Sequence, residues 1–210
     1  MTKHVDVIVV EGPAGSGKTS FIQQTFMGND MLEYVRPQIT FERPRSYEGR
    51  QGAALSTVKD FAPLVEAMLL DPDIETMVLD RFVVSSYIYD ALKKGREFND
   101  DRLLFVLQKW GELGSTIAHI LLGRGETPYG IRTQWFFMMP EFDQLCRQRD
   151  RARQEEGRSF PYSARAEYDM YEKAIQTLGR VPGAQITVVN PHAVDLSEFE
   201  DEANKHWTQQ

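Results

Sequence analysis

A glycine-rich stretch near the N-terminus carries the strongest chemical signal in the sequence. Gly12, Gly17, Lys18 and Thr19 fit the spacing G-x-x-x-x-G-K-[ST], directly after the apolar run at residues 5–10. Small residues let successive backbone N–H groups turn inward around phosphate oxygens, and the following helix points its N-terminus at the same charge. The lysine is expected to reach the β- and γ-phosphates, and the threonine hydroxyl is expected to bind Mg²⁺. The pattern therefore predicts a site for a nucleoside triphosphate, taken as ATP, made by Gly12, Pro13, Ala14, Gly15, Ser16, Gly17, Lys18, Thr19 and Ser20.

An acidic residue, Asp80, follows the short apolar stretch at residues 76–79. A carboxylate at the end of a buried strand is the usual form of the second Mg²⁺-organising group in proteins with a phosphate loop. Asp80 also precedes a helical pattern, so its side chain could instead cap that helix. The two roles are compatible, and we predict that Thr19 and Asp80 are the metal-binding side chains.

A polar cluster follows a further predicted strand at residues 37–41. It contains Glu42, Arg43 and Arg45. In open parallel sheets the binding site lies beyond the carboxyl ends of the strands, so this cluster is expected beside the phosphate loop. Two arginines and a carboxylate at that place favour substrate binding, and a solvent-exposed turn is the alternative.

Apolar patterns define the elements that must position these residues. Strands are predicted at residues 6–10, 37–41, 76–79, 134–139 and 184–189. Helices are predicted at residues 19–26, 58–70, 100–122, 162–178 and 196–207, with Gly111 and Gly114 as points where the third helix could break. This alternation predicts an α/β fold, a three-layer α/β/α sandwich of the phosphate-loop NTPase type around a five-stranded parallel sheet. No linker or repeat divides the sequence, so we predict a single domain over residues 1–210.

Composition narrows the setting in which the chain works. The formal net charge of -7 argues against a broad nucleic-acid-binding surface. The single cysteine, Cys146, cannot form an internal disulfide and has no cluster of metal-ligating neighbours. No apolar run approaches the length of a membrane span, and the N-terminus leads directly into the first predicted strand. We therefore expect a soluble cytoplasmic protein without a membrane partner.

The segment at residues 80–96, DRFVVSSYIYDALKKGR, resembles the DR[YF]-x-x-S-S-x-x-Y segment of thymidylate kinases. It is also similar, with Asp in place of Glu, to the E-R-S-x-x-S segment of deoxynucleoside kinases, which belong to the same superfamily. The resemblance implies that Arg81 contacts the phosphate or the reacting oxygen of the acceptor. It also implies that the residues around Ser85 and Tyr89, with Phe82 among them, lie by the acceptor nucleoside.

Mixed charges fill residues 141–158, EFDQLCRQRDRARQEEGR. Without any family in mind, this density is typical of a solvent-exposed helix with ion pairs along its surface. The RARQEE stretch, however, is similar to the R-x-R-x-E-E stretch in the lid of deoxynucleoside kinases, and Pro161-Tyr162 resembles the P-L-x-Y that follows it. The resemblance implies an arginine-rich lid at about residues 147–161 that closes on the transferring phosphoryl group through Arg149, Arg151 and Arg153.

Phosphoryl transfer depends mostly on positioning and on neutralising charge at the γ-phosphoryl group. The residues predicted to act in catalysis are Lys18, Glu42, Arg81, Arg149, Arg151 and Arg153. Those predicted to bind the acceptor are Glu42, Arg43, Arg45, Arg81, Phe82, Ser85 and Tyr89. Glu42 matters most for the substrate class, because a hydroxyl acceptor needs a carboxylate to accept or orient its proton and a phosphate acceptor does not.

The two resemblances favour different acceptors. The DRFVVSS block favours the thymidylate kinase type, whereas the RARQEE stretch and Glu42 favour the deoxynucleoside kinase type. We predict ATP- and Mg²⁺-dependent transfer to a deoxynucleoside monophosphate, dTMP or a related pyrimidine nucleotide. The alternatives are a deoxynucleoside kinase with Glu42 as base, a kinase acting on a modified pyrimidine in DNA, and a non-enzymatic nucleotide-binding switch. The negative net charge of the chain disfavours the kinase that acts on DNA. Analogy with these families alone suggests a homodimer.

Overall fold

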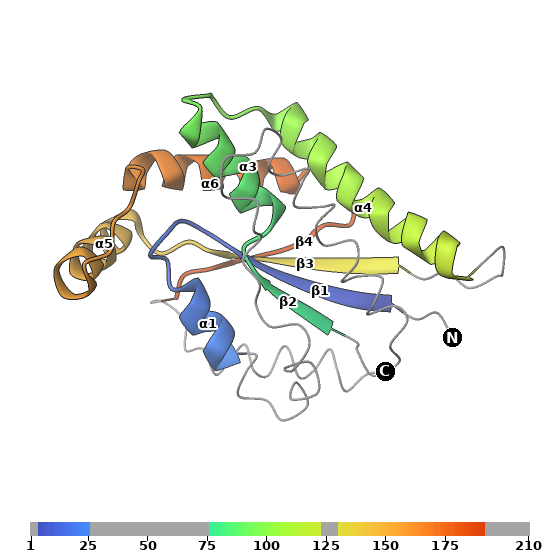
Figure 1. Ribbon diagram of the computed structural model, residues 1–210, viewed down its shortest axis with the longest axis horizontal. Coiled ribbons are helices and arrows are strands. Elements are labelled where there is room, and N and C mark those ends of the chain that lie inside the picture. The colour runs from blue at the N-terminus through green and yellow to red at the C-terminus, as the bar shows by residue number, and fades with distance from the viewer. Residues whose placement is uncertain (1–3, 26–75, 123–129, 192–210) are drawn as a thin grey trace.

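The computed structural model describes residues 4–25, 76–122 and 130–191 (Figure 1). The predicted strand at residues 37–41 and the predicted helices at 58–70 and 196–207 lie outside these ranges, as do Glu42, Arg43 and Arg45. In chain order the described elements are β1 (His4–Glu11), α1 (Lys18–Thr25), β2 (Thr76–Asp80), α3 (Val83–Lys93), α4 (Asp100–Leu122), β3 (Gly130–Met138), α5 (Phe142–Glu156), α6 (Ala164–Leu178) and β4 (Gln185–Val189).

The sheet is parallel throughout its described part, with the strand order β2-β1-β3-β4. It has four strands in this part rather than the five that were predicted, because the strand expected at residues 37–41 lies outside the described residues. The register aligns Val10 with Asp80 and Glu11 with Phe137. The carboxyl ends of β1, β2 and β3 therefore lie side by side.

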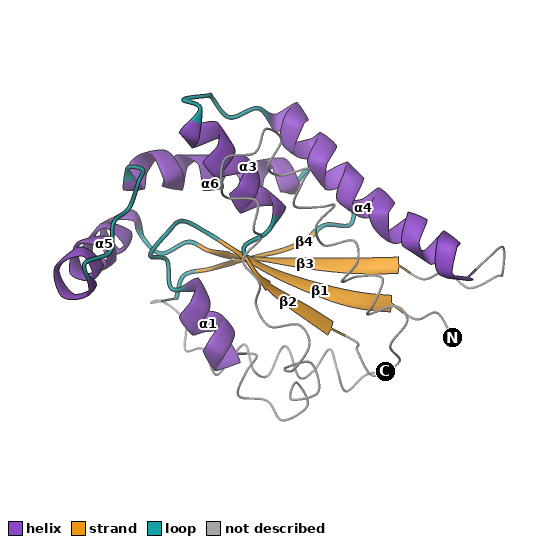
Figure 2. Cartoon of the chain, viewed as in Figure 1, coloured by secondary structure: helices purple, strands orange, loops and turns teal. Residues whose placement is uncertain are grey.

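Both faces of the sheet are apolar, as a parallel sheet covered by helices requires. Successive side chains of β1 point to opposite faces: Val7 and Val9 join one apolar cluster, while Ile8 and Val10 join another. Helices α3, α4 and α6 cover the first face, and α1 lies against the second (Figure 1). The strands thus form the middle of three layers (Figure 2).

The aromatic run of β3 belongs to the core on both faces of the sheet. Trp135 and Phe137 pack in the cluster beneath α3, α4 and α6, and Phe136 and Met138 pack in the cluster beneath α1. All four side chains are buried. The strand begins four residues earlier than the pattern of apolar residues indicated, at Gly130, because its first residues pair with the start of β1.

Helix α4 is continuous over its 23 residues, and the predicted break at Gly111 and Gly114 is absent. A glycine inside a helix costs about 1 kcal/mol relative to alanine. Burial of Leu103, Val106 and Trp110 on the same helix offsets that cost. Among the described residues, no helix is both long enough and apolar enough to cross a membrane.

Candidate active site

The phosphate loop connects the end of β1 to the start of α1, and its first glycine is required by the backbone. Gly12 has φ +143°, and a Cβ atom at this position would lie 2.5 Å from the carbonyl oxygen of Met138. Any other side chain would therefore clash with the end of β3 and would also strain the backbone. The loop is further closed by a hydrogen bond from the Ser16 N–H to the Pro13 carbonyl, 3.2 Å long.

Lys18 lies folded against the loop that it follows. Its Nζ donates to the Pro13 carbonyl oxygen at 2.6 Å and to Ser16 Oγ at 3.2 Å, and the side chain is 4% exposed. Burial, and next the positive charge of Arg81, lower the pKa of the Lys18 ammonium well below its ordinary value. A cation that has been stripped of water and faces another cation is well placed to gain from an anionic ligand.

The two side chains that the sequence assigns to the metal lie in contact. Thr19 Oγ1 donates a hydrogen bond of 2.9 Å to Asp80 Oδ2 across the gap between α1 and β2. The other carboxylate oxygen, Asp80 Oδ1, is buried and has no hydrogen-bond partner among the described residues. An unpartnered carboxylate oxygen next to a hydroxyl is the kind of donor set that Mg²⁺ takes when phosphates and water supply its other ligands. These residues therefore fit the metal.

Arg81 has a strained backbone. Its φ is 72°, the only positive φ of a residue other than glycine in the described part of the chain. Its N–H donates to the Val10 carbonyl at 2.9 Å, and its guanidinium donates to Tyr89 Oη at 3.0 Å and lies 5.3 Å from the centre of the Tyr89 ring. Non-glycine residues in this region are concentrated at functional sites, where the surrounding structure enforces the strain.

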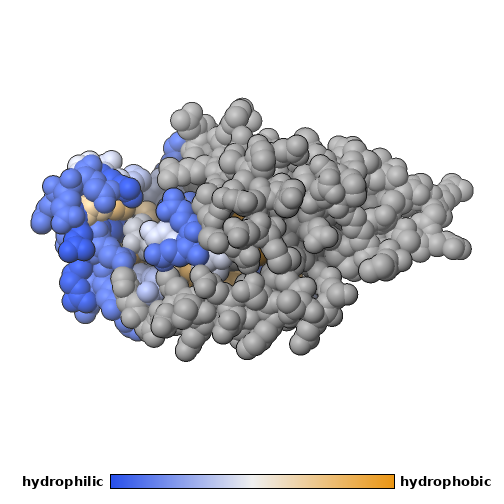
Figure 3. Space-filling model, turned by 90° about the horizontal axis from the view of Figure 1, so that it is seen from below, coloured by the Kyte–Doolittle hydropathy of each residue, from blue (hydrophilic) through white to orange (hydrophobic). Residues whose placement is uncertain are grey.

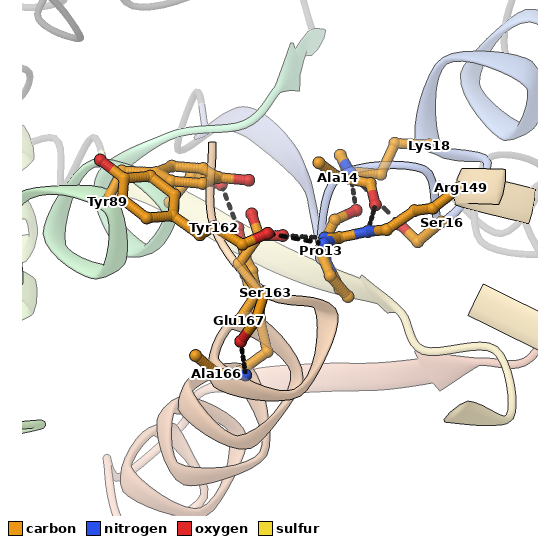
Figure 4. Close-up of polar contacts among 12 residues, drawn as sticks. Pro13, Ala14, Ser16, Lys18, Tyr89, Arg149, Tyr162, Ser163, Ala166 and Glu167 are labelled. Atoms are coloured by element: carbon orange, nitrogen blue, oxygen red, sulfur yellow. Dashed lines mark hydrogen bonds and ion pairs between the residues drawn. The ribbon is translucent and has the colours of Figure 1, made fainter. Parts of the chain in front are cut away.

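Helix α5 contacts the phosphate loop through Arg149. The Nε donates to the Ala14 carbonyl at 2.8 Å, and a terminal nitrogen donates to the Tyr162 carbonyl at 3.3 Å. Arg149 also forms a buried ion pair with Glu167 of α6, and its guanidinium lies 4.9 Å from the centre of the Phe160 ring. Figure 4 shows this side chain reaching between the phosphate loop at Ala14 and the start of α6. Arg149 thus joins three segments that are distant in sequence.

The other two arginines predicted for the lid point to the surface. Arg151 pairs with Glu155 at 3.3 Å and Arg153 pairs with Asp150 at 2.8 Å, and all four side chains are exposed. These are the ion pairs of a solvent-exposed helix, the first of the two interpretations of this segment. Hydrophilic residues accordingly cover the end of the molecule where α5 lies (Figure 3). The lid and its closure over the phosphates stay a prediction.

The residues predicted around the acceptor divide into two groups. Tyr89 is partly exposed, and its ring lies 5.9 Å from that of Tyr162. Phe82 and Ser85 are fully buried. The Phe82 ring packs edge-on against Trp110, with the ring centres 4.7 Å apart, and Ser85 Oγ forms hydrogen bonds with the buried side chains of Glu11 and Tyr171. Any effect of these two residues on an acceptor therefore has to pass through their neighbours.

Two buried carboxylates at the site were not identified from the sequence. Glu167 is the partner of Arg149, and Glu11, the last residue of β1, bonds to the start of α3. Glu11 carried a usable signal, since it is an acidic residue at the end of an apolar strand, as Asp80 is. Glu167 carried none, because it lies in a helix rich in charged and polar residues.

No family model and no curated protein matches this chain. Solved structures do match it. The YorR protein from Bacillus subtilis, solved in complex with phosphorylated GDP, has a TM-score of 0.54 and 13% identity over 96% of this chain and 95% of its own. A presumed kinase from Chloroflexus aurantiacus has a TM-score of 0.51 and 14% identity over 99% of this chain and 98% of its own. The chain has the fold of P-loop kinases. A deoxyadenosine kinase from M. mycoides is less similar, with a TM-score of 0.46 and 10% identity over 97% and 100%.

The P-loop kinase fold explains why residues so far apart in the sequence meet. Lys18, Thr19, Asp80 and Arg81 lie where β1 and β2 end, and α5 brings Arg149 to the same place. The TM-scores of 0.54 and 0.51 support this fold, and identities of 13% and 14% leave the substrate to be argued from the site itself.

Proposed function

We propose that the protein is a kinase that transfers the γ-phosphoryl group of ATP to a deoxynucleoside monophosphate, dTMP or a related pyrimidine nucleotide. The observation that carries the proposal is the contact of Thr19 with Asp80 at 2.9 Å, with a second Asp80 oxygen left buried and unpartnered among the described residues. A buried carboxylate oxygen without a partner needs an explanation, and a metal ion beside the phosphate loop and the Thr19 hydroxyl would provide one. A phosphate-loop enzyme needs that oxygen for its metal.

The donor half of the site follows from the phosphate loop. Thr19 and Asp80 would hold Mg²⁺, which would neutralise charge on the phosphates of the donor. Lys18 exchanges its bonds to Pro13 and Ser16 for bonds to phosphate oxygens, and its ammonium remains opposite the charge that develops in the transition state. These groups are preorganised, so they need little rearrangement at the moment of transfer.

The acceptor half rests on Arg81. Its guanidinium is held by Tyr89 beside the phosphate loop, where it repels Lys18 and would bind an anionic group. A monophosphate supplies such an anion, whereas a free nucleoside does not. Attack by the acceptor phosphate oxygen on the γ-phosphorus forms one P–O bond, the β–γ bridging P–O bond breaks, and ADP leaves. No proton has to be removed from a dianionic phosphate, so this reaction needs no general base.

The acceptor class is tested by product analysis. The protein is incubated with Mg²⁺, γ-labelled ATP and a panel of deoxynucleosides, deoxynucleoside monophosphates and DNA that contains modified pyrimidines. We expect labelled diphosphate from dTMP or another pyrimidine monophosphate. Labelled monophosphate from a free nucleoside would instead indicate a deoxynucleoside kinase, and label in DNA would move the acceptor to a polymer.

Glu42 separates the first two outcomes independently, although it lies outside the described residues. Glu42→Gln is expected to reduce the rate several-fold at most if the acceptor is a monophosphate. A loss of about 10²-fold or more would contradict the proposal, since it is the loss expected of a general base.

A further inference from the structure

Glu11 is a fully buried carboxylate that stands directly before the phosphate loop. Its Oε1 accepts hydrogen bonds from the Phe82 N–H at 2.9 Å and the Ser85 N–H at 3.2 Å. Its Oε2 accepts a bond from Ser85 Oγ, and that hydroxyl in turn lies 2.7 Å from Tyr171 Oη. The carboxylate therefore begins a buried polar chain that runs from β1 through α3 to α6.

Through these bonds, a residue of strand β1 caps helix α3, which follows strand β2 in the chain. The N-cap residue of α3, Phe82, has no side-chain oxygen, and no local side-chain bond caps this helix. Glu11 supplies the missing acceptor and also places a carboxylate at the positive end of the helix dipole. As a result, the first turn of α3 is fixed to β1 instead of to its own flanking residues.

The residue held between these contacts is Arg81. On its N-terminal side the Arg81 N–H bonds to the carbonyl of Val10, and on its C-terminal side the next residue, Phe82, bonds to Glu11. The last two residues of β1 thus clamp the backbone on both sides of the position with φ 72°. A left-handed arginine persists only where its surroundings enforce it, and these two contacts do so.

We infer that Glu11 is a positioning residue for phosphoryl transfer, which sets Asp80 and Arg81 against the phosphate loop by holding the start of α3. The inference rests on the proposed function. The proposed role goes beyond stabilisation of the fold, because Glu11 links two parts of the site. It precedes Gly12 of the phosphate loop in the chain, and it binds the N–H of Phe82, the residue that follows Arg81. Loss of the cap would free Arg81 to leave its strained conformation while the phosphate loop stayed intact.

Glutamine should replace Glu11 in this role. Its carbonyl oxygen can accept both N–H bonds, and its amide nitrogen can donate to Ser85 Oγ, which keeps Tyr171 as partner. Burial raises the pKa of the Glu11 carboxyl, against the effect of its bonds from Ser85 and Phe82, so a neutral side chain fits the site. Alanine leaves both N–H groups without an acceptor.

The test compares the wild type with Glu11→Ala, Glu11→Gln and Tyr171→Phe. Tyr171→Phe is the control, since it removes the outer end of the chain but leaves both N–H bonds to Glu11. We expect Glu11→Ala to lower kcat per folded protein by about 10²-fold, the effect of a small misplacement of catalytic groups, with metal-free ATP affinity changed less than about threefold. Glu11→Gln and Tyr171→Phe should stay within about threefold of the wild-type kcat.

Two further readouts do not depend on turnover. In Glu11→Ala, Mg²⁺ should no longer strengthen ATP binding, and the amides of Phe82 and Ser85 should exchange faster with solvent. If Glu11→Ala does not fold, Glu11→Asp, which withdraws the carboxylate by one methylene, takes its place with the same expectations. A folded variant with the wild-type kcat and the wild-type Mg²⁺ effect would overturn the inference.

The outcome separates this inference from the proposed function. If the wild type transfers phosphate to no acceptor in the panel, the proposed function fails. The positioning role is then decided by ATP binding and amide exchange: loss of the Mg²⁺ effect in Glu11→Ala supports it, and an unchanged effect contradicts it.

Discussion

The Nε of Arg149 donates a hydrogen bond of 2.8 Å to the carbonyl oxygen of Ala14 and so ties the arginine-rich helix α5 to the phosphate loop. The same guanidinium pairs with Glu167, and both side chains are almost completely buried. Burial lowers the pKa of Arg149, but an arginine stays charged over the whole physiological range. Arg149 therefore holds α5 and α6 against the phosphate loop, besides the role in transfer that the sequence predicts for it.

Arg149 and Arg151 provide a matched pair of variants on one helix. Arg149→Ala leaves Glu167 buried without a partner, so we expect the free energy of unfolding to fall by about 3 kcal/mol. For a chain of this size the melting temperature should drop by roughly 6–12 °C. Arg151→Ala removes only an exposed ion pair with Glu155 and should leave the melting temperature nearly unchanged. Thermal unfolding of the two variants measures the difference, and equal melting temperatures would contradict the anchoring role.

The strain at Arg81 can be measured with two substitutions. Glycine adopts φ 72° without a steric penalty and alanine does not, so Arg81→Gly should be more stable than Arg81→Ala by about 1 kcal/mol. Both variants lose the guanidinium and should lose at least about 10²-fold in transfer rate. Denaturant unfolding gives the stability difference. An alanine variant as stable as the glycine variant would show that the backbone relaxes once the arginine is removed.

Lys18 makes ATP binding depend on pH. Its pKa is lowered in the free protein, and phosphates beside the ammonium should raise it again, so the complex holds more protons than the free protein. ATP affinity should therefore fall as pH rises through the lowered pKa and should level off once the pH exceeds the pKa in the complex. Calorimetry in buffers of different ionisation enthalpy should show proton uptake. Lys18→Arg, which keeps its charge, should show no such uptake; equal uptake in this variant would assign the proton to another group.

Asp80→Asn tests the metal site. Asparagine can still accept the bond from Thr19, so metal-free ATP binding should be unchanged. The amide cannot replace the buried carboxylate oxygen as a ligand of Mg²⁺, so Mg²⁺ should no longer strengthen ATP binding and turnover should fall by about 10²-fold or more. ATP titrations with and without Mg²⁺ measure this. A variant that keeps the full Mg²⁺ effect would place the metal elsewhere.

Much of the fold could be predicted from the sequence, because its elements have strong local patterns. The apolar run of β1, the apolar run of β3 and the glycine spacing of the phosphate loop each depend on neighbours within a few residues. The contact of Thr19 with Asp80 was also predictable, since parallel strands bring their carboxyl ends together. The helix break at Gly111 was a wrong alternative, because tertiary packing of α4 outweighs the low helix propensity of glycine.

Contacts between elements distant in sequence could not be predicted in the same way. Nothing in the sequence around Arg149 distinguishes it from Arg151 and Arg153, yet it is the one of the three that is buried against Ala14 and Glu167. Likewise, the hydroxyl of Ser85 faces Glu11 because of the rotation of α3 on the sheet. That rotation is set by packing, which a local pattern does not report.

The central claim is that this chain transfers the γ-phosphoryl group of ATP to a small acceptor. The most direct measurement is the formation of dTDP from dTMP with Mg²⁺ and ATP by the wild type and by Lys18→Ala, each shown to be folded. The account predicts one dTDP for each ADP with the wild type and loss of this activity in the variant. Equal rates for both proteins would contradict the phosphate-loop assignment, and release of ADP by the wild type without a phosphorylated acceptor would contradict the kinase itself.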